Sequence, residues 1–302
     1  MDRLYVTMDV FTEHVFGGNP LAVVLNGAGL TAQQMQAIAT EFNYSETTFV
    51  LPPRDPAHTA HVRIFTARTE VPFAGHPNVG IAVALARELA ARGTAVGDRF
   101  VFEEAAGLIP IRLLRSGDRV VGARLTAPKE LTVGATVSDR DAAQCVSLSE
   151  SEVTTRHHPP QVLSVGLPFL VVEVTSRDAL RRTRPSWAAH ERVLPPIGTD
   201  GVLAYFREPE ATHLHARVFA PLDATIEDPA TGSAAAATIA RLAGLRPATD
   251  EDLEWRIDQG VDMGRPSLMG GCTEKRGGVV KAVHIAGNAV QVMHGASPVN
   301  YR

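Results

Sequence analysis

Residues 227–237 read EDPATGSAAAA, and this stretch decides how the rest of the chain is interpreted. The four alanines continue into TIARLAGL, which predicts a helix that is apolar nearly all round. Alanine has the highest helix propensity and a small side chain, so strands can approach such a helix closely. We therefore expect a central helix that begins after residue 231 and has strands around it.

The start of this helix has a different character from its body. A helix N-terminus carries unpaired N–H groups and a partial positive charge, so it binds carboxylates and oxyanions. Gly232 allows a ligand to approach the backbone closely, and Ser233 adds a hydroxyl group. The sequence therefore predicts an anion-binding helix start beside Asp228.

A similar pattern occurs about 150 residues earlier in the chain. Three pairs of segments match in the same order: GNPLAVV at 18–24 with GLPFLVV at 166–172, VRIF at 62–65 with ARVF at 216–219, and P-x-x-G-x-A-x-A at 77–84 with the same pattern at 229–236. The alternative is that common turn and strand residues simply recur, since Gly and Pro mark many turns. We favour two related lobes, each with strands around one small-residue helix.

The boundaries of the two lobes are expected as follows. We expect an N-terminal lobe at 1–128, with the tail at about 290–302 returning to it, and a C-terminal lobe at 129–289. Residues 135–160 have the lowest complexity and are interpreted as the connection between the halves.

The first lobe supplies a second helix start, in FAGHPNVG, which contains Gly75 and His76. If the lobes pack face to face, two positive helix ends meet across one cleft, with Asp228 and His76 on its walls. Such a site suits a small acid whose proton is moved, because the helix ends stabilise a carboxylate or enolate while a nearby acid or base transfers the proton.

Glu46 is the candidate for that acid or base. It stands in FNYSETTFV at 42–50, where a predicted helix gives way to an apolar strand. A carboxyl group that is shielded from water has a raised pKa and can act in either direction. The alternative is that Glu46 is a solvated loop residue, as most acidic residues are.

Composition excludes several classes of protein. The formal net charge is −4 and there is no basic block, so we expect no nucleic-acid partner. No run of about 18 apolar residues occurs, and the start MDRLYVTMDVF does not resemble a secretory signal, so we expect no membrane partner. Two cysteines, Cys145 and Cys272, cannot form a disulfide framework, which favours the cytoplasm.

The histidines do not predict a metal site. The spacing of His157 and His158, taken with His190, suits no ligand pair, and we interpret these three as surface residues. His213 and His215 alternate on a strand, which fits one solvated face. We therefore expect no bound metal.

Taken together, these motifs resemble the PhzF family, the phenazine-biosynthesis isomerase-like proteins that share the diaminopimelate epimerase fold. The similar stretches are MDVFTEHVFGGNPLAVVL, EFNYSETTFVLPP, VRIFTARTEVPFAGHPNVG, SVGLPFLVVEV, ARVFAP and EDPATGSAAAA, with a looser likeness in QGVDMGRP. The resemblance implies an α+β fold with two pseudo-symmetric lobes, each a curved, mostly antiparallel sheet wrapped around a central helix. It also implies an active site between the lobes, and a homodimer.

The resemblance also assigns roles within this sequence. The family's phenazine enzyme isomerises trans-2,3-dihydro-3-hydroxyanthranilate by shifting a proton without a cofactor, so we expect an isomerase of a small carboxylic or amino acid that needs no cofactor. The catalytic residues that this implies are Glu46, His76 and Asp228, and the expected substrate-binding residues are Gly75, Gly232, Ser233, Ser45 and Asn19.

Two alternatives remain open. One is an epimerase or lyase on the same fold, although the related epimerases and racemases place one cysteine at the start of each central helix and this chain has none there. The other is a protein that binds a small acid without chemistry. Exchange of a substrate C–H proton with solvent distinguishes an enzyme of either kind from a binding protein.

Overall fold

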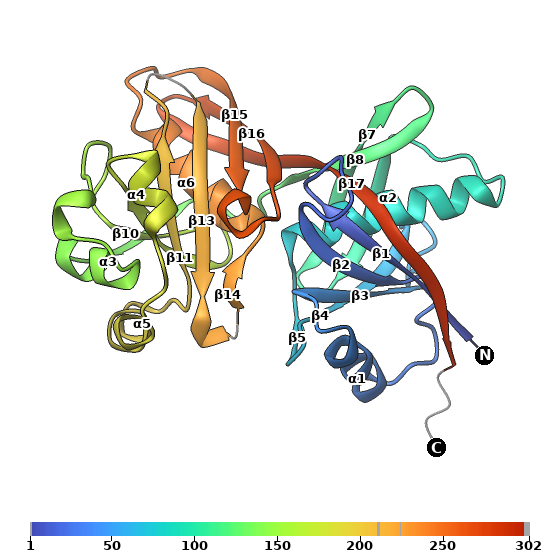
Figure 1. The fold of residues 1–302 in the computed structure, drawn as a ribbon. Helices are drawn as coiled ribbons and strands as arrows, with labels where there is room; N and C mark the ends of the chain where they lie inside the picture. The colour runs from blue at the N-terminus through green and yellow to red at the C-terminus, as the bar shows by residue number, and fades with distance from the viewer. Residues whose placement is uncertain (1, 210–211, 224, 299–302) are drawn as a thin grey trace. The chain divides into compact units, whose positions relative to one another are not determined.

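Strands form most of the regular structure in the computed structural model, which describes residues 2–209, 212–223 and 225–298. The chain divides into two compact units (Figure 1). Unit 1 contains the residues up to Leu125 together with those from Ala286 onward, and unit 2 contains Thr126–Ile285.

Both units contain strands and helices. Those that begin in unit 1 are β1 (Asp2–Val10), β2 (Asn19–Val24), α1 (Ala32–Phe42), β3 (Glu46–Leu51), β4 (Ala60–Phe65), β5 (Glu70–Val71), α2 (Gly75–Ala91), β6 (Arg99–Glu104), β7 (Gly107–Ser116) and β8 (Arg119–Thr126). Those that begin in unit 2 are β9 (Thr132–Thr136), α3 (Asp139–Cys145), β10 (Gln161–Ser164), β11 (Pro168–Glu173), α4 (Arg177–Arg182), α5 (Trp187–Val193), β12 (Val202–Arg207), β13 (His213–Ala220), β14 (Thr225–Asp228), α6 (Gly232–Gly244), β15 (Glu251–Gln259), β16 (Ser267–Arg276) and β17 (Val279–Pro298).

The strands of unit 1 pair in a definite order. β1 is antiparallel to β2, β2 is parallel to β3, β3 is antiparallel to β4, β4 is parallel to β6, and β6 is antiparallel to β7. The other edge of β1 pairs antiparallel with the last part of β17, where Val10 lies opposite Ala289. This sheet is therefore completed by residues from the far end of the sequence.

Unit 2 repeats the same order of pairs. β10 is antiparallel to β11, β11 is parallel to β12, β12 is antiparallel to β13, β13 is parallel to β15, and β15 is antiparallel to β16. The matched sequence segments fall on matching elements, namely β2 and β11, β4 and β13, and α2 and α6.

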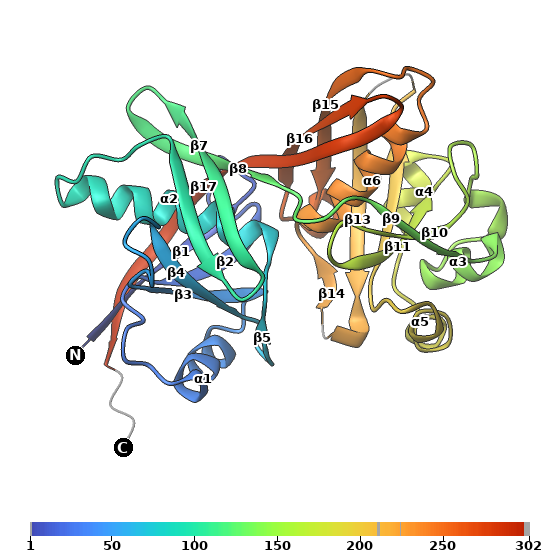
Figure 2. The same cartoon turned by 180° about the vertical axis from the view of Figure 1, so that it is seen from behind.

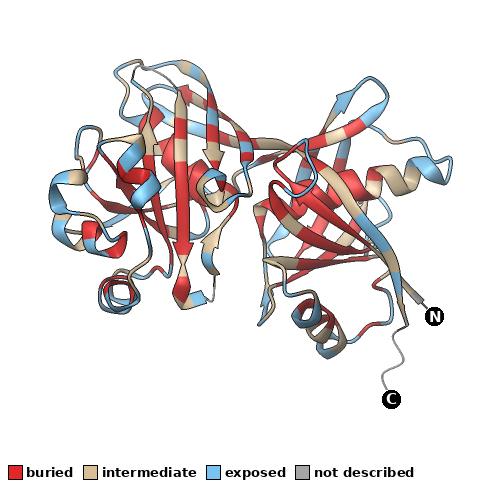
Figure 3. Cartoon of the chain, in the orientation of Figure 1, coloured by how far each residue is buried: buried red, intermediate tan, exposed pale blue. Residues whose placement is uncertain are grey.

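Helix α2 packs against β1, β2, β3 and β7 with its N-terminal half buried (Figure 3). Gly80 permits this close packing, because a Cβ atom there would lie 2.4 Å from Cδ2 of Leu21 and 2.9 Å from Cγ2 of Val10. The prediction of a small-residue helix with strands around it is confirmed for α2 in unit 1.

Helix α1 packs against β3 and β4 (Figure 2). Its N-cap is Thr31, whose hydroxyl accepts a hydrogen bond from the backbone N–H of Gln34. Met35 and Ile38 pack in one cluster with Phe49 and Phe65. With α2 also in contact with β3, this arrangement buries the middle of that strand.

In unit 2, α6 contacts β10, β11, β15 and β16, and its residues from Ala234 to Ala240 are buried as predicted. A separate cluster joins β11 and β12 to the short helices α3, α4 and α5. The interpretation of residues 135–160 as a simple connection is wrong, since α3 lies within it and contributes the buried Ala142 and Cys145 to this cluster.

Within the described residues, no helix combines the length and the apolar character that crossing a membrane requires.

Candidate active site

Glu46 and His76 form the most distinctive contact in unit 1. Glu46 is the first residue of β3, and His76 is the second residue of α2. The Oε2 atom of Glu46 lies 3.2 Å from Nε2 of His76, and the two side chains are only 17% and 7% exposed. Proton transfer between heavy atoms takes place at about this distance. The alternative that Glu46 is a solvated loop residue is wrong.

Asn19 holds the other side of the imidazole. Its Nδ2 atom lies 3.5 Å from Nδ1 of His76, at the long end of hydrogen bonding, and the residue is fully buried at the start of β2. The preceding Gly18 has a φ of +62°, and a Cβ atom there would lie 2.3 Å from the carbonyl oxygen of Val10. Glycine is therefore required in the turn that delivers Asn19 to His76.

Burial sets the charge of His76. Loss of contact with water lowers the pKa of the imidazole to about 3, because the charged form cannot be hydrated there. The ring is therefore neutral near pH 7, with one nitrogen that carries a proton and one that accepts. A donor amide from Asn19 facing Nδ1 favours the tautomer with the proton on Nε2, the atom that faces Glu46.

The two central helices begin differently from the others. Among the α-helices of the described chain, α1, α3, α4 and α5 each have a serine or threonine N-cap whose hydroxyl accepts a first-turn N–H. The N-cap residues of α2 and α6 are Ala74 and Thr231, and neither side chain caps its helix. No acidic residue occupies the first turn of either helix. This is the pattern of a helix start that offers its N–H groups to a ligand.

In unit 2, Asp228 ends β14 and holds the turn before α6. The hydroxyl of Thr231 donates to Oδ2 of Asp228 at 2.5 Å, so this threonine orients the carboxylate instead of capping the helix. The buried Gln259 spans the same turn: its Nε2 donates to the carbonyl oxygen of Asp228 at 2.8 Å, and its Oε1 accepts from the N–H of Thr231 at 3.2 Å. The turn is thus fixed by side-chain bonds before the helix begins.

The remaining predicted site residues lie near these two groups. Gly75 and Gly232 are the first residues of α2 and α6, as their sequence motifs predict. Ser233 is half-buried in the first turn of α6, and Ser45 is half-buried immediately before β3. The structure therefore brings Glu46, His76 and Asn19 together in unit 1, and Asp228, Gly232 and Ser233 together around one helix start in unit 2.

Sequence reasoning did not select a buried pair close to His76. Asn78, in the first turn of α2, donates through Nδ2 to the carbonyl oxygen of Ala74 at 3.0 Å, and Glu104 ends β6 as a buried residue. Burial raises the pKa of Glu104 to about 8, an effect that Asn78 partly offsets. Two consecutive acids ending the apolar run RFVFEE are the sequence signal that marks this position.

The interpretation of His157, His158 and His190 as surface residues is wrong for two of the three. His158 is 2% exposed and lies 2.9 Å from the hydroxyl of Tyr205, and His190 is fully buried with Nε2 at 3.0 Å from the carbonyl oxygen of Cys145. Burial lowers the pKa of both. Only His157 is partly exposed, and its Nδ1 lies 2.7 Å from Glu173.

The cysteines do not provide a thiol pair at the helix starts. Cys145 is buried in α3, and burial raises the pKa of its thiol to about 12, so it stays protonated. Cys272 lies in β16.

Comparison with known proteins gives consistent results along the whole chain. The family model for phenazine biosynthesis-like proteins (PhzC-PhzF) matches residues 8–295. An uncharacterized isomerase of Mesorhizobium japonicum is 37% identical over 303 residues, which cover 97% of this chain and 98% of the relative. Trans-2,3-dihydro-3-hydroxyanthranilate isomerase of Pseudomonas chlororaphis is 34% identical over 292 residues, with 95% and 96% covered.

A solved structure shares the fold. A phenazine biosynthesis protein of the PhzF family from Bacillus anthracis superposes with a TM-score of 0.87 at 25% identity, and the match covers 99% of this chain and 100% of that one.

Proposed function

The chain belongs to the PhzC-PhzF family of phenazine biosynthesis-like proteins, and we propose that this isomerase moves a proton within a small carboxylic or amino acid by general acid–base catalysis without a cofactor. The observation that carries the proposal is the 3.2 Å contact between the nearly buried side chains of Glu46 and His76. The substrate class includes trans-2,3-dihydro-3-hydroxyanthranilate, which a relative at 34% identity is named for.

Glu46 acts as the base and then as the acid. Its carboxylate removes a C–H proton next to an activating group, exchanges that proton with solvent, and delivers a proton to another carbon of the same molecule, so no proton is gained or lost overall. The imidazole of His76 orients the carboxylate and stays uncharged while it does so, because burial holds its pKa far below neutral pH. Asn19 and Ser45 assist from the same unit, the first by fixing the ring.

The N-termini of α2 and α6 are assigned to binding the negatively charged group of the substrate. Both lack a side-chain cap in the described chain, so the N–H groups at Gly75, Gly232 and Ser233 are suited to a carboxylate or to the enolate that forms when the proton leaves. Asp228, held by Thr231, receives the substrate amine or hydroxyl group.

The proposal also concerns the architecture of the two units. We infer that the units are pseudo-symmetric lobes, each a curved sheet around its central helix, with the division near residues 128 and 289. The identical order of strand pairs in the two units and the matched segments on β2 and β11 support this inference.

Solvent exchange tests the chemistry. In deuterated water, the wild-type protein supplied with trans-2,3-dihydro-3-hydroxyanthranilate, or with other hydroxy- or amino-substituted cyclic carboxylic acids, should yield product that carries one deuteron on carbon. Both an isomerase and an epimerase incorporate it, and the position of the new C–H bond separates the two. No exchange into any of these acids, with binding retained, would indicate a binding protein.

Substitution of the base tests the assignment. Glu46→Gln keeps the shape of the side chain but cannot accept a proton, so turnover should fall by at least about a hundredfold while the fold is retained. Glu41→Gln, at an exposed position near the end of α1, is the matched control and should leave turnover unchanged. Near-normal turnover in Glu46→Gln would remove Glu46 from the mechanism.

A further inference from the structure

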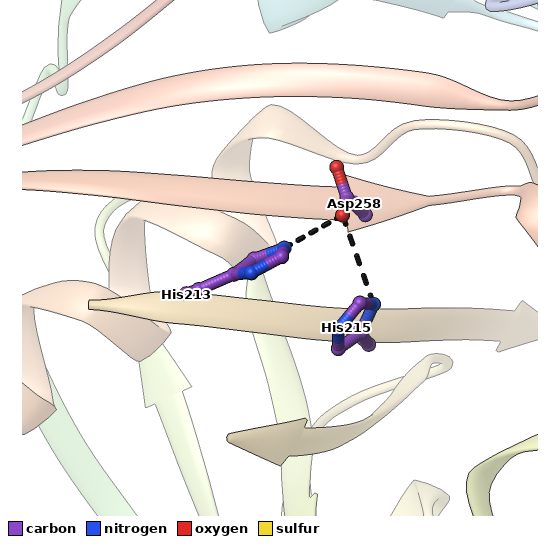
Figure 4. A group of neighbouring side chains, drawn as sticks. All are labelled: His213, His215 and Asp258. Carbon is purple, nitrogen blue, oxygen red and sulfur yellow. Dashed lines mark hydrogen bonds and ion pairs between the residues drawn. The ribbon is translucent and has the colours of Figure 1, made fainter. Parts of the chain in front are cut away.

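The side chains of two histidines and an aspartate converge in unit 2, and none of the three is among the residues assigned to catalysis. His213 and His215 lie in β13, and Asp258 lies in the adjacent parallel strand β15, directly opposite His215 (Figure 4). Side chains two residues apart in a strand share a face, so both imidazoles point to the same side as the carboxylate. The sequence interpretation of one solvated face was incomplete, because it could not include Asp258.

The donor atoms are close enough to share one ion. The Oδ2 atom of Asp258 lies 2.6 Å from Nε2 of His213 and 3.7 Å from Nδ1 of His215, and the ligand atoms of all three residues lie within 4.8 Å of one another. Ligand bonds of about 2.0–2.2 Å at tetrahedral angles put donor atoms about 3.3 Å apart. Shifts of less than about 1 Å therefore suffice for both distances to Asp258.

The neighbouring side chains of Glu208 and Arg256 orient these donor atoms. The carboxylate of Glu208 lies 3.1 Å from Nε2 of His215, which places the ring proton there and turns the lone pair of Nδ1 toward Asp258. Arg256 binds the other oxygen of Asp258, Oδ1, at 3.2 Å, so that Oδ2 alone faces the imidazoles. Outer contacts of this kind orient the ligands of metal centres in proteins.

We propose that His213, His215 and Asp258 form a binding site for a divalent transition-metal ion of the zinc type. Two imidazoles and one carboxylate are a donor set that suits Zn²⁺ and not Mg²⁺ or Ca²⁺, which prefer oxygen ligands in larger number. All three residues are half-buried, so an ion can enter from solvent and keep a water molecule as its fourth ligand.

The positions of the donor atoms favour a bound ion over hydrogen bonds between the three side chains alone. With its proton on Nε2, His215 presents an unshared electron pair to a carboxylate oxygen at 3.7 Å, and a cation between the two removes that repulsion. An ion bound to Nε2 of His213 takes the place between that atom and Oδ2, and the imidazole then carries its proton on Nδ1.

The site ties together two strands that position the turn before α6. Gln259, which follows Asp258 directly, lies opposite Ala216 of β13 and bonds to Asp228 and Thr231. An ion at the site links β13 and β15 one residue away from that contact. Metal binding should therefore stabilise unit 2 as well as occupy the site.

Calorimetric titration of the metal-free, untagged full-length protein with ZnCl₂ tests the proposal. We expect one saturable ion per chain, a rise in the thermal midpoint, and no binding of MgCl₂ under the same conditions. His213→Ala and the conservative Asp258→Asn should each weaken Zn²⁺ binding by at least about tenfold, and Glu208→Gln should weaken it by roughly tenfold.

His157→Gln is the matched control, because His157 also faces a carboxylate, at 2.7 Å from Glu173, but has no second imidazole in that contact. It should leave Zn²⁺ binding unchanged. The proposal is overturned if the wild-type protein takes up no ion with one-to-one stoichiometry, or if folded His213→Ala and Asp258→Asn bind Zn²⁺ as tightly as the wild type does.

Discussion

His76 lies 3.2 Å from Glu46 through Nε2 and 3.5 Å from Asn19 through Nδ1, so both ring nitrogens face a polar side chain although the residue is only 6% exposed. A buried, neutral imidazole with one partner on each side has a fixed orientation. The surroundings of His76 and of the two central helices lead to the following effects on stability and turnover, each of which can be measured.

Acid should destabilise the protein through His76. Burial lowers its pKa in the folded state from 6.5 to about 3, so between these values the unfolded chain binds a proton that the folded chain does not. This contribution to stability is present above about pH 6.5 and is lost as the pH falls toward 3. His76→Gln lacks this titration. Its free energy of unfolding, measured with urea from neutral to acidic pH, should therefore fall less steeply than that of the wild type; parallel curves would contradict the neutral imidazole.

Glu104 should have the opposite pH dependence. Its folded-state pKa is raised by burial from 4.5 to about 8, so between these values the folded chain holds a proton that the unfolded chain releases, and stability falls as the pH rises. The Glu104→Gln variant has a side chain that stays neutral across this pH range. Its thermal midpoint should exceed that of the wild type near pH 8, and the difference should shrink toward pH 5. The Glu41→Gln variant, at an exposed position, is the control. If the thermal midpoints of Glu104→Gln and Glu41→Gln depend on pH in the same way, burial does not keep the Glu104 carboxyl group protonated.

Removal of the Gln259 side-chain amide should loosen the turn that carries Asp228. In Gln259→Leu, the carbonyl oxygen of Asp228 and the N–H of Thr231 each lose a hydrogen bond in a half-buried turn, at a total cost of about 1–3 kcal/mol. Urea unfolding measures this loss, and turnover should fall because Asp228 is no longer held. Gln33→Leu on the exposed face of α1 should change stability by less than about 0.5 kcal/mol. Equal effects in the two variants would rule out the bracing role of Gln259.

Overpacking at Gly80 should push α2 away from its strands. A methyl group there would meet Leu21 at 2.4 Å, so Gly80→Ala should cost about 1–3 kcal/mol even though alanine favours helices. Gly97→Ala adds the same group where nothing lies within 4 Å, and it should be close to neutral in the same unfolding assay. A stabilised Gly80→Ala variant would show that the helix can move without cost.

The sequence predicts the central helices well because their determinants are local. A glycine at the start, a run of small residues and the absence of charged residues from the first turn place Gly75 and Gly232 at the beginnings of α2 and α6. The contact between Glu46 and His76 depends on packing of β3 against α2, and only the likeness to known proteins brought these residues together in advance.

Other features escape a reading of the sequence because their partners are distant. His158 and His190 resemble surface residues until Tyr205 and the carbonyl oxygen of Cys145 are placed beside them. Asp258 meets the histidines of β13 only through a parallel strand pair.

The short helices α3, α4 and α5 span too few turns for apolar periodicity to reveal them. Their serine caps, Ser138, Ser176 and Ser186, are local signals that could have located them.

The pairing of β1 with the end of β17 has a consequence for synthesis of the protein. A ribosome that has translated Leu125 has made most of unit 1, but the backbone of β1 still lacks the neighbour that runs from Ala289 to Pro298. Unit 2 is complete at Ile285, before that neighbour is translated. The part of the protein that is made first is therefore finished last, and a gene fragment that stops after unit 2 would leave an open sheet edge that invites aggregation.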